Sequence, residues 1–304
     1  MDDSAARARI PYLDFEDINT EEVCRAVEGW APDLLFVVGL SQIVRRPLLS
    51  LPTIGCIGFH PTWLPIGRGR APLAWLVLDG VPGAATFFLM NADVDSGPIL
   101  IQEPFFVGAT DYAADVEQKM LDAIDRALDQ WIPRLKAGEW DPQPQDDTAA
   151  TYNGSRRPED ALIQWDKSAL EIASLVRAAS MPHPGAYTYV SGHRLTIWRA
   201  EPMKDNRHRG VVGRILKLDA AGHLLVQTGG GLICVTEYEI DGAEGVLPHL
   251  VPGVKLGYEP QHEIHRLVSM ITRLQQEVRE LHRVLAAKDE HRTMNVSFSG
   301  ESVS

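Results

Sequence analysis

One stretch, from Gly55 to Phe105, constrains the fold of this chain more than any other. An apolar run from Thr53 to Phe59 has the composition of a β-strand, and it ends at His60-Pro61. Proline lacks an N–H group and has a fixed φ, so it stops the strand and makes the chain turn. We therefore predict the imidazole of His60 at the C-terminal end of a strand, the edge at which open α/β sheets bind their ligands.

The residues after this strand predict a tight backbone and anion-binding side chains. Arg68-Gly69-Arg70 combines a glycine, which allows a tight turn, with two guanidinium groups whose forked donors suit phosphate or carboxylate. The apolar run from Ala71 to Leu78 predicts a short helix, and Ala85 to Met90 predicts a returning strand. A polar loop containing Asp95 follows, and Ile99 to Phe106 predicts a further strand.

The segment before this stretch adds a β-α-β unit. Asn19-Thr20-Glu21-Glu22 can start a helix, because Asn or Thr caps the first turn and acidic side chains favour it. Leu34 to Gly39 is a continuous apolar run, as expected of a strand buried on both faces of a parallel sheet. With the amphipathic segment from Asp111 to Leu135 as a covering helix, these elements predict an α/β domain.

These motifs resemble the core of the folate-dependent formyltransferases. The family signature runs Asn-x-His-Pro-Ser, then Leu-Leu-Pro and Arg-Gly, then Asp before a small-Gly-Pro turn. The matching positions here are His60, Pro61, Thr62, Leu64, Pro65, Arg68, Gly69, Asp95, Gly97 and Pro98. The resemblance implies a Rossmann-like formyltransferase domain. It departs at one position, because the catalytic asparagine two residues before the histidine is replaced by Gly58.

The resemblance implies catalytic roles for His60 and Asp95. His60 is expected to contact the tetrahedral oxyanion and to assist deprotonation of the acceptor amine, and Asp95 to orient and charge the imidazole or to relay protons. Gly58 cannot supply the amide with which the family's asparagine stabilises the oxyanion. Losing one such donor typically costs a factor of about 10² to 10³ in turnover. A water or Thr62, which is near in sequence, is a candidate replacement.

The co-substrate implied by the resemblance is 10-formyltetrahydrofolate, and no metal is implied. A pterin ring needs an apolar slot with a few backbone donors and acceptors. The residues expected to hold it are Leu40, Ser41, Gln42, Ile43 and Val44 in one loop, and Asn91, Val94 and Asp95 in another. The alternative for the first loop is a connector without a ligand. Arg68, Arg70 and Pro65 are expected at the substrate, with the arginines on a phosphate or on the folate tail.

The remaining chain predicts a second domain. Residues 138–155, rich in Pro, Gln and Asp, predict a linker between a catalytic domain over residues 1–137 and a domain over residues 156–256. The latter resembles the C-terminal domain of methionyl-tRNA and aminoarabinose formyltransferases, a small β-barrel. Its short strands between Gly-rich turns agree with that expectation.

Residues 257–292 predict a coiled-coil helix. Position a holds Ile264, Ile271, Val278 and Leu285, and position d holds Leu267, Leu274 and Leu281. Mainly β-branched residues at a with leucine at d favour a parallel two-stranded coil. We therefore expect a homodimer through residues 264–285, the alternative being a helix packed on its own domain. The Ser-rich residues 293–304 predict a disordered tail.

The resemblance also implies a β-α-β unit that this sequence does not contain. Formyltransferases begin with such a unit, and Ile10-Pro11-Tyr12 resembles the segment that follows it; Ile10 to Ile18 are predicted as a strand and loop. Either the true start lies upstream of Met1 or this protein does without the unit, and a sheet without it exposes a face and an edge. We expect a partner or dimerisation to cover them.

Composition narrows the function classes. The 304 residues suffice for two domains, and the net charge of −12 disfavours a nucleic-acid partner. There is no apolar run long enough to span a membrane and the start Met1-Asp2-Asp3 is acidic, so we expect a cytoplasmic chain. Cys24, Cys56 and Cys234 lack metal-ligand spacing and are expected to be buried thiols.

The leading interpretation is an N-formyltransferase. It would move a formyl group from 10-formyltetrahydrofolate to a primary amine of a small molecule, with a nucleotide-linked amino sugar as the first candidate. Within the class, a methionyl-tRNA formyltransferase, disfavoured by the charge, and a formyltetrahydrofolate hydrolase are alternatives. From another class comes a catalytically impaired formyltransferase-like binding or assembly protein, suggested by Gly58 and the C-terminal helix.

Overall fold

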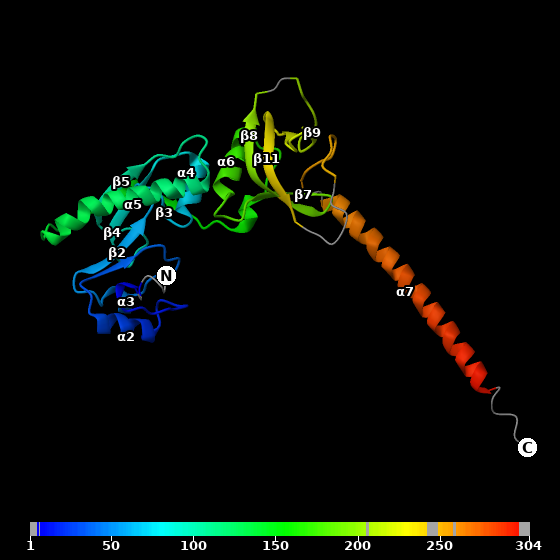
Figure 1. Ribbon diagram of the computed structural model, residues 1–304, viewed down its shortest axis with the longest axis horizontal. Helices are drawn as coiled ribbons and strands as arrows, with labels where there is room; N and C mark the ends of the chain where they lie inside the picture. The colour runs from blue at the N-terminus through cyan, green and yellow to red at the C-terminus, as the bar shows by residue number, and fades with distance from the viewer. Residues whose placement is uncertain (1–4, 6, 205–206, 242–248, 258–259, 298–304) are drawn as a thin grey trace, which may run out of the picture.

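The computed structural model describes residues 5, 7–204, 207–241, 249–257 and 260–297, without the side chains of 261–263, 266 and 284–297. Figure 1 shows an N-terminal α/β domain, a second domain beside it, and one long helix that projects from the second domain. The exact domain boundaries at residues 137 and 156 stay a prediction.

The N-terminal domain is built on a four-stranded sheet in the order β1-β2-β4-β5. Its strands are β1 (Leu34–Val37), β2 (Gly55–His60), β4 (Gly83–Leu89) and β5 (Ile99–Phe105), and its helices are α2 (Glu21–Trp30), α3 (Arg46–Leu49), α4 (Pro72–Asp79) and α5 (Ala113–Lys136). β1 and β2 are parallel, whereas β4 runs antiparallel to both β2 and β5. The α/β prediction is confirmed.

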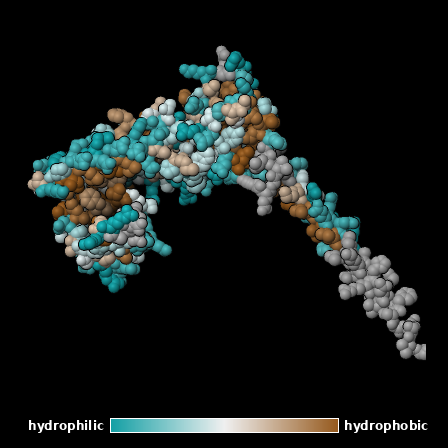
Figure 2. Space-filling view, in the orientation of Figure 1, coloured by the Kyte–Doolittle hydropathy of each residue, from teal (hydrophilic) through white to brown (hydrophobic). Residues whose placement is uncertain are grey.

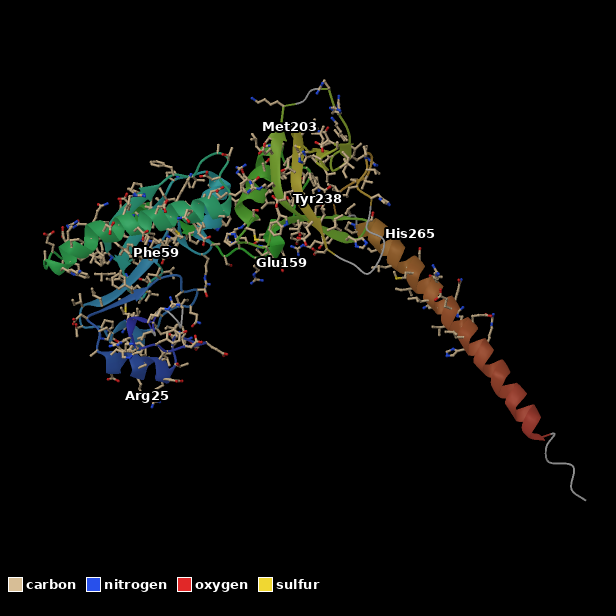
Figure 3. The ribbon with its side chains drawn as sticks, viewed as in Figure 1. Arg25, Phe59, Glu159, Met203, Tyr238 and His265 are labelled. Atoms are coloured by element: carbon tan, nitrogen blue, oxygen red, sulfur yellow. The ribbon has the colours of Figure 1, made fainter. Side chains whose placement is uncertain are left out.

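The alternation of side chains along β2 separates the core from the candidate site. Ile57 and Phe59 point to the face covered by α5, where Phe87 of β4 stacks on Trp131 with ring centroids 6.4 Å apart. Figure 3 labels Phe59 on this strand. Because successive strand residues point to opposite faces, Gly58 and His60 occupy the other face. The same strand therefore anchors the core and presents the candidate site.

The N-terminal segment departs from the prediction. Residues 10–18 form no strand, and irregular chain runs there instead. The side chain of Gln42 ties this segment down, accepting from Ile18 N at 2.9 Å and donating to Glu16 O at 2.7 Å. Three acidic residues interrupt the apolar pattern of the segment (Asp14, Glu16 and Asp17), which disfavours a buried ladder.

β1 lies at one edge of the sheet, and apolar side chains near it are exposed. Trp30, Phe36 and Val38 are each more than two-fifths exposed. Figure 2 shows hydrophobic surface gathered in a hollow of this domain. The exposed edge and face agree with the expectation drawn from the sequence. What covers them stays a prediction.

The segment between the domains is ordered against the first domain. It contains a short 3-10 helix (Asp147–Ala149), the strand β6 (Tyr152–Asn153) and a second 3-10 helix (Pro158–Ala161). β6 pairs in parallel with β3 (Arg68–Gly69), which follows the His60 loop. The predicted linker is therefore also a structural part of the candidate site.

The second domain is a five-stranded antiparallel sheet with one covering helix. Its strands are β7 (Ala186–Val190), β8 (His193–Met203), β9 (Ile215–Leu218), β10 (Leu224–Gln227) and β11 (Leu232–Ile240), in the order β7-β8-β11-β10-β9, and its helix is α6 (Ala169–Ala179). α6 packs on β8 and also on α4 of the first domain. Between β7 and β9 the described residues form no ladder, so closure into a barrel stays a prediction.

The last helix, α7 (Pro260–Ser297), leaves the second domain as a single rod (Figure 1). Figure 3 places His265 close to the point of departure. The helix continues five residues beyond the predicted end at residue 292, so the predicted tail of 293–304 is helical up to Ser297. The rest of that tail, 298–304, lies outside the described residues. No helix in the described part of the chain is long and apolar enough to span a membrane.

The three cysteines differ in burial. Cys56 on β2 is buried, and burial raises the pKa of its thiol to about 11. Cys24 and Cys234 are half-buried, so the expectation of buried thiols is confirmed fully only for Cys56.

This difference makes the fold testable by alkylation. At pH 8 we expect iodoacetamide to modify Cys24 within the native chain while Cys56 stays unmodified, because only the thiolate reacts and Cys56 is both protonated and inaccessible. Peptide mass spectrometry with and without guanidinium measures both sites. Equal labelling of the two cysteines in native protein would contradict the burial of β2.

Candidate active site

His60 lies at the C-terminal end of β2, where the sequence predicts it. The side chain is 5% exposed. Its Nε2 is 2.9 Å from Gly67 O, and because a carbonyl oxygen can only accept, this nitrogen carries a proton. Nδ1 then faces the carboxylate of Asp95, with 3.6 Å between Nδ1 and Oδ2. The structure thus brings the predicted pair together.

Asp95 reaches His60 because its loop folds back over the sheet. The same Oδ2 accepts a hydrogen bond from Gly69 N at 2.9 Å. Asp95 has a φ of +51°, an uncommon conformation for a residue with a Cβ. Gly97 follows in close contact with β4, since a Cβ there would lie 1.6 Å from Leu89 O. The glycine of the Asp-x-Gly-Pro turn is therefore required by this fold-back.

The loop after His60 is held by a buried polar network. The Thr62 hydroxyl donates to Ile66 O at 2.7 Å, and Thr86 of β4 donates to Thr62 O at 2.7 Å. Gln102 of β5 donates to Leu64 O at 3.0 Å. The proton of Thr62 is thus engaged inside the loop, which does not support the suggestion that Thr62 replaces the missing oxyanion donor.

The position of the missing asparagine is filled by apolar side chains. Phe88 lies directly opposite Gly58 in the β2–β4 ladder. A Cβ built on Gly58 would lie 2.7 Å from Phe88 Cζ and 3.0 Å from Met90 Cγ. Because Phe88 is itself buried, at 3% exposed, its ring cannot simply swing into solvent. Gly58 is therefore closely packed, and an asparagine at this position fits only if the neighbouring side chains make room for it.

Arg68 lies in a buried hydrogen-bond network. Its guanidinium is 1% exposed. It donates to Gln145 Oε1 (3.1 Å from Nε and 2.8 Å from Nη2), to Asp147 Oδ1 (2.7 Å) and to Tyr152 OH (3.0 Å). These bonds use donors that a ligand would need, and substrate binding by Arg68 stays a prediction.

Arg70 and Pro65 stay candidates for substrate binding, and they differ in exposure. Arg70 is exposed, and in the described part of the chain its guanidinium makes no hydrogen bond or ion pair. Pro65 is half-buried, and its carbonyl accepts from Thr151 N at 3.3 Å. Arg70 is thus a cation next to the site that remains available to an anionic group.

The two loops expected to hold a pterin start side by side. Leu40, the first residue of one loop, and Met90, which precedes the other, pack on the same apolar cluster. Within the described residues, no hydrogen bond engages the backbone N–H groups of residues 40–43, and Ile43 and Val94 are exposed. The side chain of Gln42 is used by the N-terminal segment, as described above, and Val44 is buried. Free backbone donors beside apolar side chains fit a flat heterocycle.

Asn91 has a local role in the second of these loops. Its Oδ1 accepts from Asp93 N at 3.0 Å and from Ser96 Oγ at 2.9 Å. These bonds shape the loop that carries Asp95. The side-chain oxygen of Asn91 is therefore used internally.

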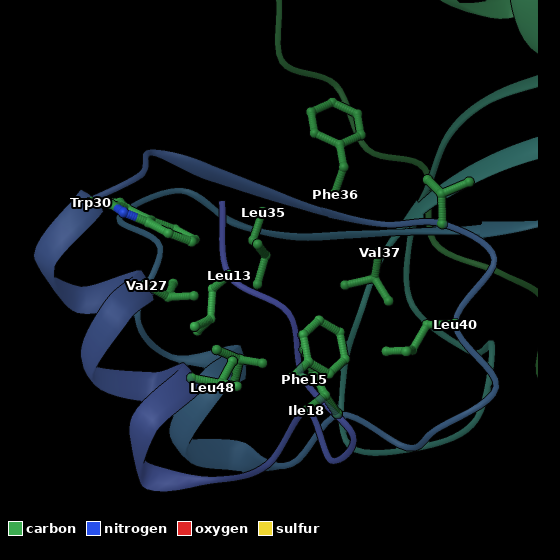
Figure 4. Close-up of a pocket in the computed structure, with 12 residues that line it drawn as sticks. Leu13, Phe15, Ile18, Val27, Trp30, Leu35, Phe36, Val37, Leu40 and Leu48 are labelled. Carbon is green, nitrogen blue, oxygen red and sulfur yellow. The ribbon is translucent and has the colours of Figure 1, made fainter. Parts of the chain in front are cut away.

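An apolar cavity lies away from the His60–Asp95 pair. It measures about 230 Å³ and lies between the N-terminal segment, α2 and β1 (Figure 4). Its lining includes Leu13, Phe15, Trp30, Phe36 and Leu40, and no titratable side chain. The cavity therefore adjoins the candidate pterin loop through Leu40, but it carries no group for proton transfer. In the described residues no three or more His, Cys, Asp or Glu side chains could hold a metal ion.

Sequence reasoning missed the residues of the linker. Gln145, Asp147 and Tyr152 surround Arg68, and Thr151 contacts the loop after His60 through Gly67 N and Pro65 O. The composition of residues 138–155 is that of a connector, and these contacts join residues about eighty positions apart. Such pairing has no local signal in one sequence.

Two family profiles match the chain. The profile described as Formyl transferase covers residues 7–132, and the profile described as Formyl transferase, C-terminal domain, covers residues 156–246. The methionyl-tRNA formyltransferase of Geobacter sulfurreducens is 31% identical over 257 residues, which are 82% of this chain and 79% of that protein. Similarity therefore extends over both domains.

Solved structures share the fold. HypX from Aquifex aeolicus, in complex with tetrahydrofolic acid, aligns with a TM-score of 0.58 and 19% identity over 71% of this chain. The alignment covers 37% of HypX, so this chain spans well under half of that protein. The N-formyltransferase from Helicobacter canadensis, in complex with folinic acid and dTDP-3-aminofucose, aligns with a TM-score of 0.56 and 15% identity over 77% of this chain and 81% of that one.

The agreement of sequence motifs, both profiles and the Geobacter relative leads to one conclusion. This chain belongs to the formyltransferase family, one-carbon transferases that use formyl-tetrahydrofolate as co-substrate.

Proposed function

We propose that this chain transfers the formyl group of 10-formyltetrahydrofolate to a primary amine of a small molecule, with a nucleotide-linked amino sugar as the acceptor class. The observation that carries the proposal is the His60–Asp95 pair, with 3.6 Å between Nδ1 and Oδ2 at the C-terminal end of β2. Formyl transfer needs a group that takes a proton from the acceptor nitrogen and one that returns it to the leaving nitrogen. A histidine backed by a carboxylate can serve both needs.

We assign the roles from the contacts. The Nε2–H of His60 donates to Gly67 O, which holds the ring in one orientation. Nδ1 is then the nitrogen at which a proton is exchanged, and the Asp95 carboxylate stabilises the imidazolium that forms. Gly69 N holds that carboxylate in turn. The co-substrate supplies the formyl group, and the loops at residues 40–44 and 91–95 would hold its pterin.

Three observations favour a small phosphorylated acceptor over tRNA. The net charge of −12 opposes the phosphate neutralisation on which nucleic-acid binding depends. Arg70 is an exposed cation beside the site, and its forked donors suit a diphosphate. The Helicobacter canadensis neighbour was solved with dTDP-3-aminofucose. Against this stands the name of the Geobacter relative, a methionyl-tRNA formyltransferase, so tRNA is the second candidate.

A catalytically impaired binding protein is the candidate of another class. The observation that favours it is the ring of Phe88 over Gly58, which puts an apolar group where the family places an oxyanion donor. Removing one such donor lowers turnover by about 10² to 10³ without abolishing it. We therefore expect a slow enzyme.

The proposed partner of α7 is a second copy of this chain. Its a and d side chains with described positions, from Ile264 to Leu281, are 44–62% exposed, and among the described residues the helix makes no extensive contact with another element (Figure 1). The predicted a position Leu285 belongs to the helix, but its side chain lies outside the described residues. Each large apolar side chain buried contributes about 1.5 to 3 kcal/mol before entropy costs. Pairing two helices through this stripe removes the exposed surface, which supports the coiled coil.

The catalytic pair is tested by substitutions that keep local packing. Asp95→Asn retains an acceptor for Gly69 N but removes the charge, and His60→Gln retains a polar side chain. We expect each to lower the rate of tetrahydrofolate release by about 10² to 10⁴, the usual contribution of general acid–base catalysis. Asp93→Asn, in the same loop and exposed, is the matched control. Turnover like that of the wild type in both variants would refute the assignment.

The Gly58 site is tested in two backgrounds. Gly58→Asn alone should lower the free energy of unfolding by about 1 to 3 kcal/mol through overpacking against Phe88, and it should not raise turnover. In a Phe88→Ala background the same substitution has room, and we expect turnover to rise by up to about 10² relative to Phe88→Ala. Thermal melts and initial rates give both quantities. No gain in the double variant would favour the binding protein.

The coiled coil is tested at a central d position. Leu274→Asp should convert a particle of twice the 33.6-kDa chain mass into monomers at micromolar concentration, because a buried unpaired carboxylate opposes pairing. Gln276→Asp adds the same charge at an outer heptad position and should leave the dimer intact. Light scattering distinguishes the two. A monomeric wild type would contradict the coiled coil and would favour packing of α7 within one chain.

A further inference from the structure

The segment between the two domains lies across both loops of the candidate active site. Gln143 exchanges two backbone hydrogen bonds with Ile99, at the end of the Asp95 loop. Thr151 and Asn153 bond to the segment from Pro65 to Arg70, at the end of the His60 loop. Between these two attachments lies Gln145. We propose that Gln145 is a positioning residue that sets the place of the Asp95 carboxylate relative to His60.

The amide of Gln145 holds the backbone of the Asp95 loop. Its Nε2 donates to Asp95 O at 2.9 Å and to Gly97 O at 2.7 Å, so both amide hydrogens are used. Asp95 has a positive φ, a conformation that costs free energy for a residue with a Cβ and persists only where the surroundings enforce it. Two hydrogen bonds to the residues on either side of Ser96 are such an enforcement.

Arg68 sets the orientation of that amide. Two of its nitrogens donate to Gln145 Oε1, at 3.1 and 2.8 Å. A guanidinium can only donate, so the oxygen of Gln145 must face Arg68 and the NH₂ group must face the Asp95 loop. Asp147 and Tyr152 hold the rest of the guanidinium, and burial at 1% exposure leaves water little access. The buried cation therefore fixes which end of the amide reaches the loop.

The linker also supports the backbone groups that contact His60 and the Asp95 carboxylate. Gly67 O receives the Nε2–H of His60, and Gly69 N donates to Asp95 Oδ2. Arg68, between these glycines, pairs with Tyr152 in the β3–β6 ladder. The linker therefore supports the acceptor of His60 through its backbone and the carboxylate of Asp95 through Gln145.

The distance between His60 and Asp95 makes the exact position of the Asp95 loop important for the rate. A separation of 3.6 Å between Nδ1 and Oδ2 is longer than a hydrogen bond, so a small loop shift decides whether the contact forms. Misplacement of a catalytic group by about 1 Å can cost 10²-fold in rate. Because Gln145 contacts neither reacting group, its loss should lower kcat and leave KM unchanged. The inference rests on the proposed catalytic roles of His60 and Asp95.

Two substitutions separate the functions of the amide. Gln145→Glu keeps the acceptor for Arg68 but cannot donate to Asp95 O and Gly97 O, whereas Gln145→Met removes both functions. We expect kcat to fall about 10- to 100-fold in both, with KM within twofold of the wild type. Gln143→Met is the matched control, because its exposed side chain bonds only to Asp141 O among the described residues.

Amide hydrogen exchange tests the positioning without any substrate. The Gly69 N–H bonds to Asp95 Oδ2, whereas Arg68 N and Arg70 N bond to the linker carbonyls of Thr151 and Asn153. In Gln145→Met we expect faster exchange at Gly69 and unchanged exchange at Arg68 and Arg70. Equal loss of protection at all three amides would mean that β3 and β6 separate, which overturns a positioning role.

The outcomes separate this inference from the proposed function. Wild-type protection of Gly69 in Gln145→Met would overturn the inference whatever the activity. Faster exchange at Gly69 with unchanged kcat would overturn it as well, because the position of Asp95 would then not matter. Activity retained in His60→Gln and Asp95→Asn would instead remove the proposed catalytic pair, while the exchange at Gly69 would still report whether Gln145 holds the loop.

Discussion

The buried guanidinium of Arg68 is the interaction on which the candidate site depends. A cation removed from water must be paired and hydrogen-bonded, or its burial costs several kcal/mol. Here Gln145, Asp147 and Tyr152, all from the segment between the domains, supply the partners. Satisfying this one charge therefore requires the linker to lie across the first domain. The linker in turn contacts the loops that carry His60 and Asp95.

The two faces of β2 show how one strand serves stability and chemistry together. Ile57 and Phe59 contribute to the core beneath α5, and the alternate residues form the face with His60. On that second face Phe88 covers Gly58, so the site combines a polar pair with an apolar neighbour where related enzymes carry an amide.

The C-terminal helix and the β1 edge are two apolar surfaces with different characters. Along α7 the exposed apolar side chains repeat every three or four residues, and the described residues of the helix make no extensive contact with another element. This pattern suits a second helix. Around β1 the exposed residues belong to a strand edge and a hollow beside α2 (Figure 2), a shape that suits a strand or a loop. The two surfaces therefore do not require the same partner.

Much of the N-terminal domain could be predicted from the sequence, because local chemistry determines it. Proline after His60 ends β2, Thr20 caps α2, and the apolar periods of residues 34–39 and 111–135 agree with β1 and α5. The proximity of His60 and Asp95 was expected from a resemblance in motif order, and the structure brings them together. The strand expected at residues 10–18 was wrong, because acidic residues and the bonds of Gln42 favour irregular chain.

Tertiary structure alone decided what surrounds the His60–Asp95 pair. The contact of Phe88 with Gly58 follows from the register of β2 and β4, and the burial of Arg68 follows from residues about eighty positions away. Neither a cross-strand register nor a long-range hydrogen bond leaves a period or a spacing in the sequence. The same guanidinium suits a phosphate or a buried network equally well, and only the path of the linker determines which partner it meets.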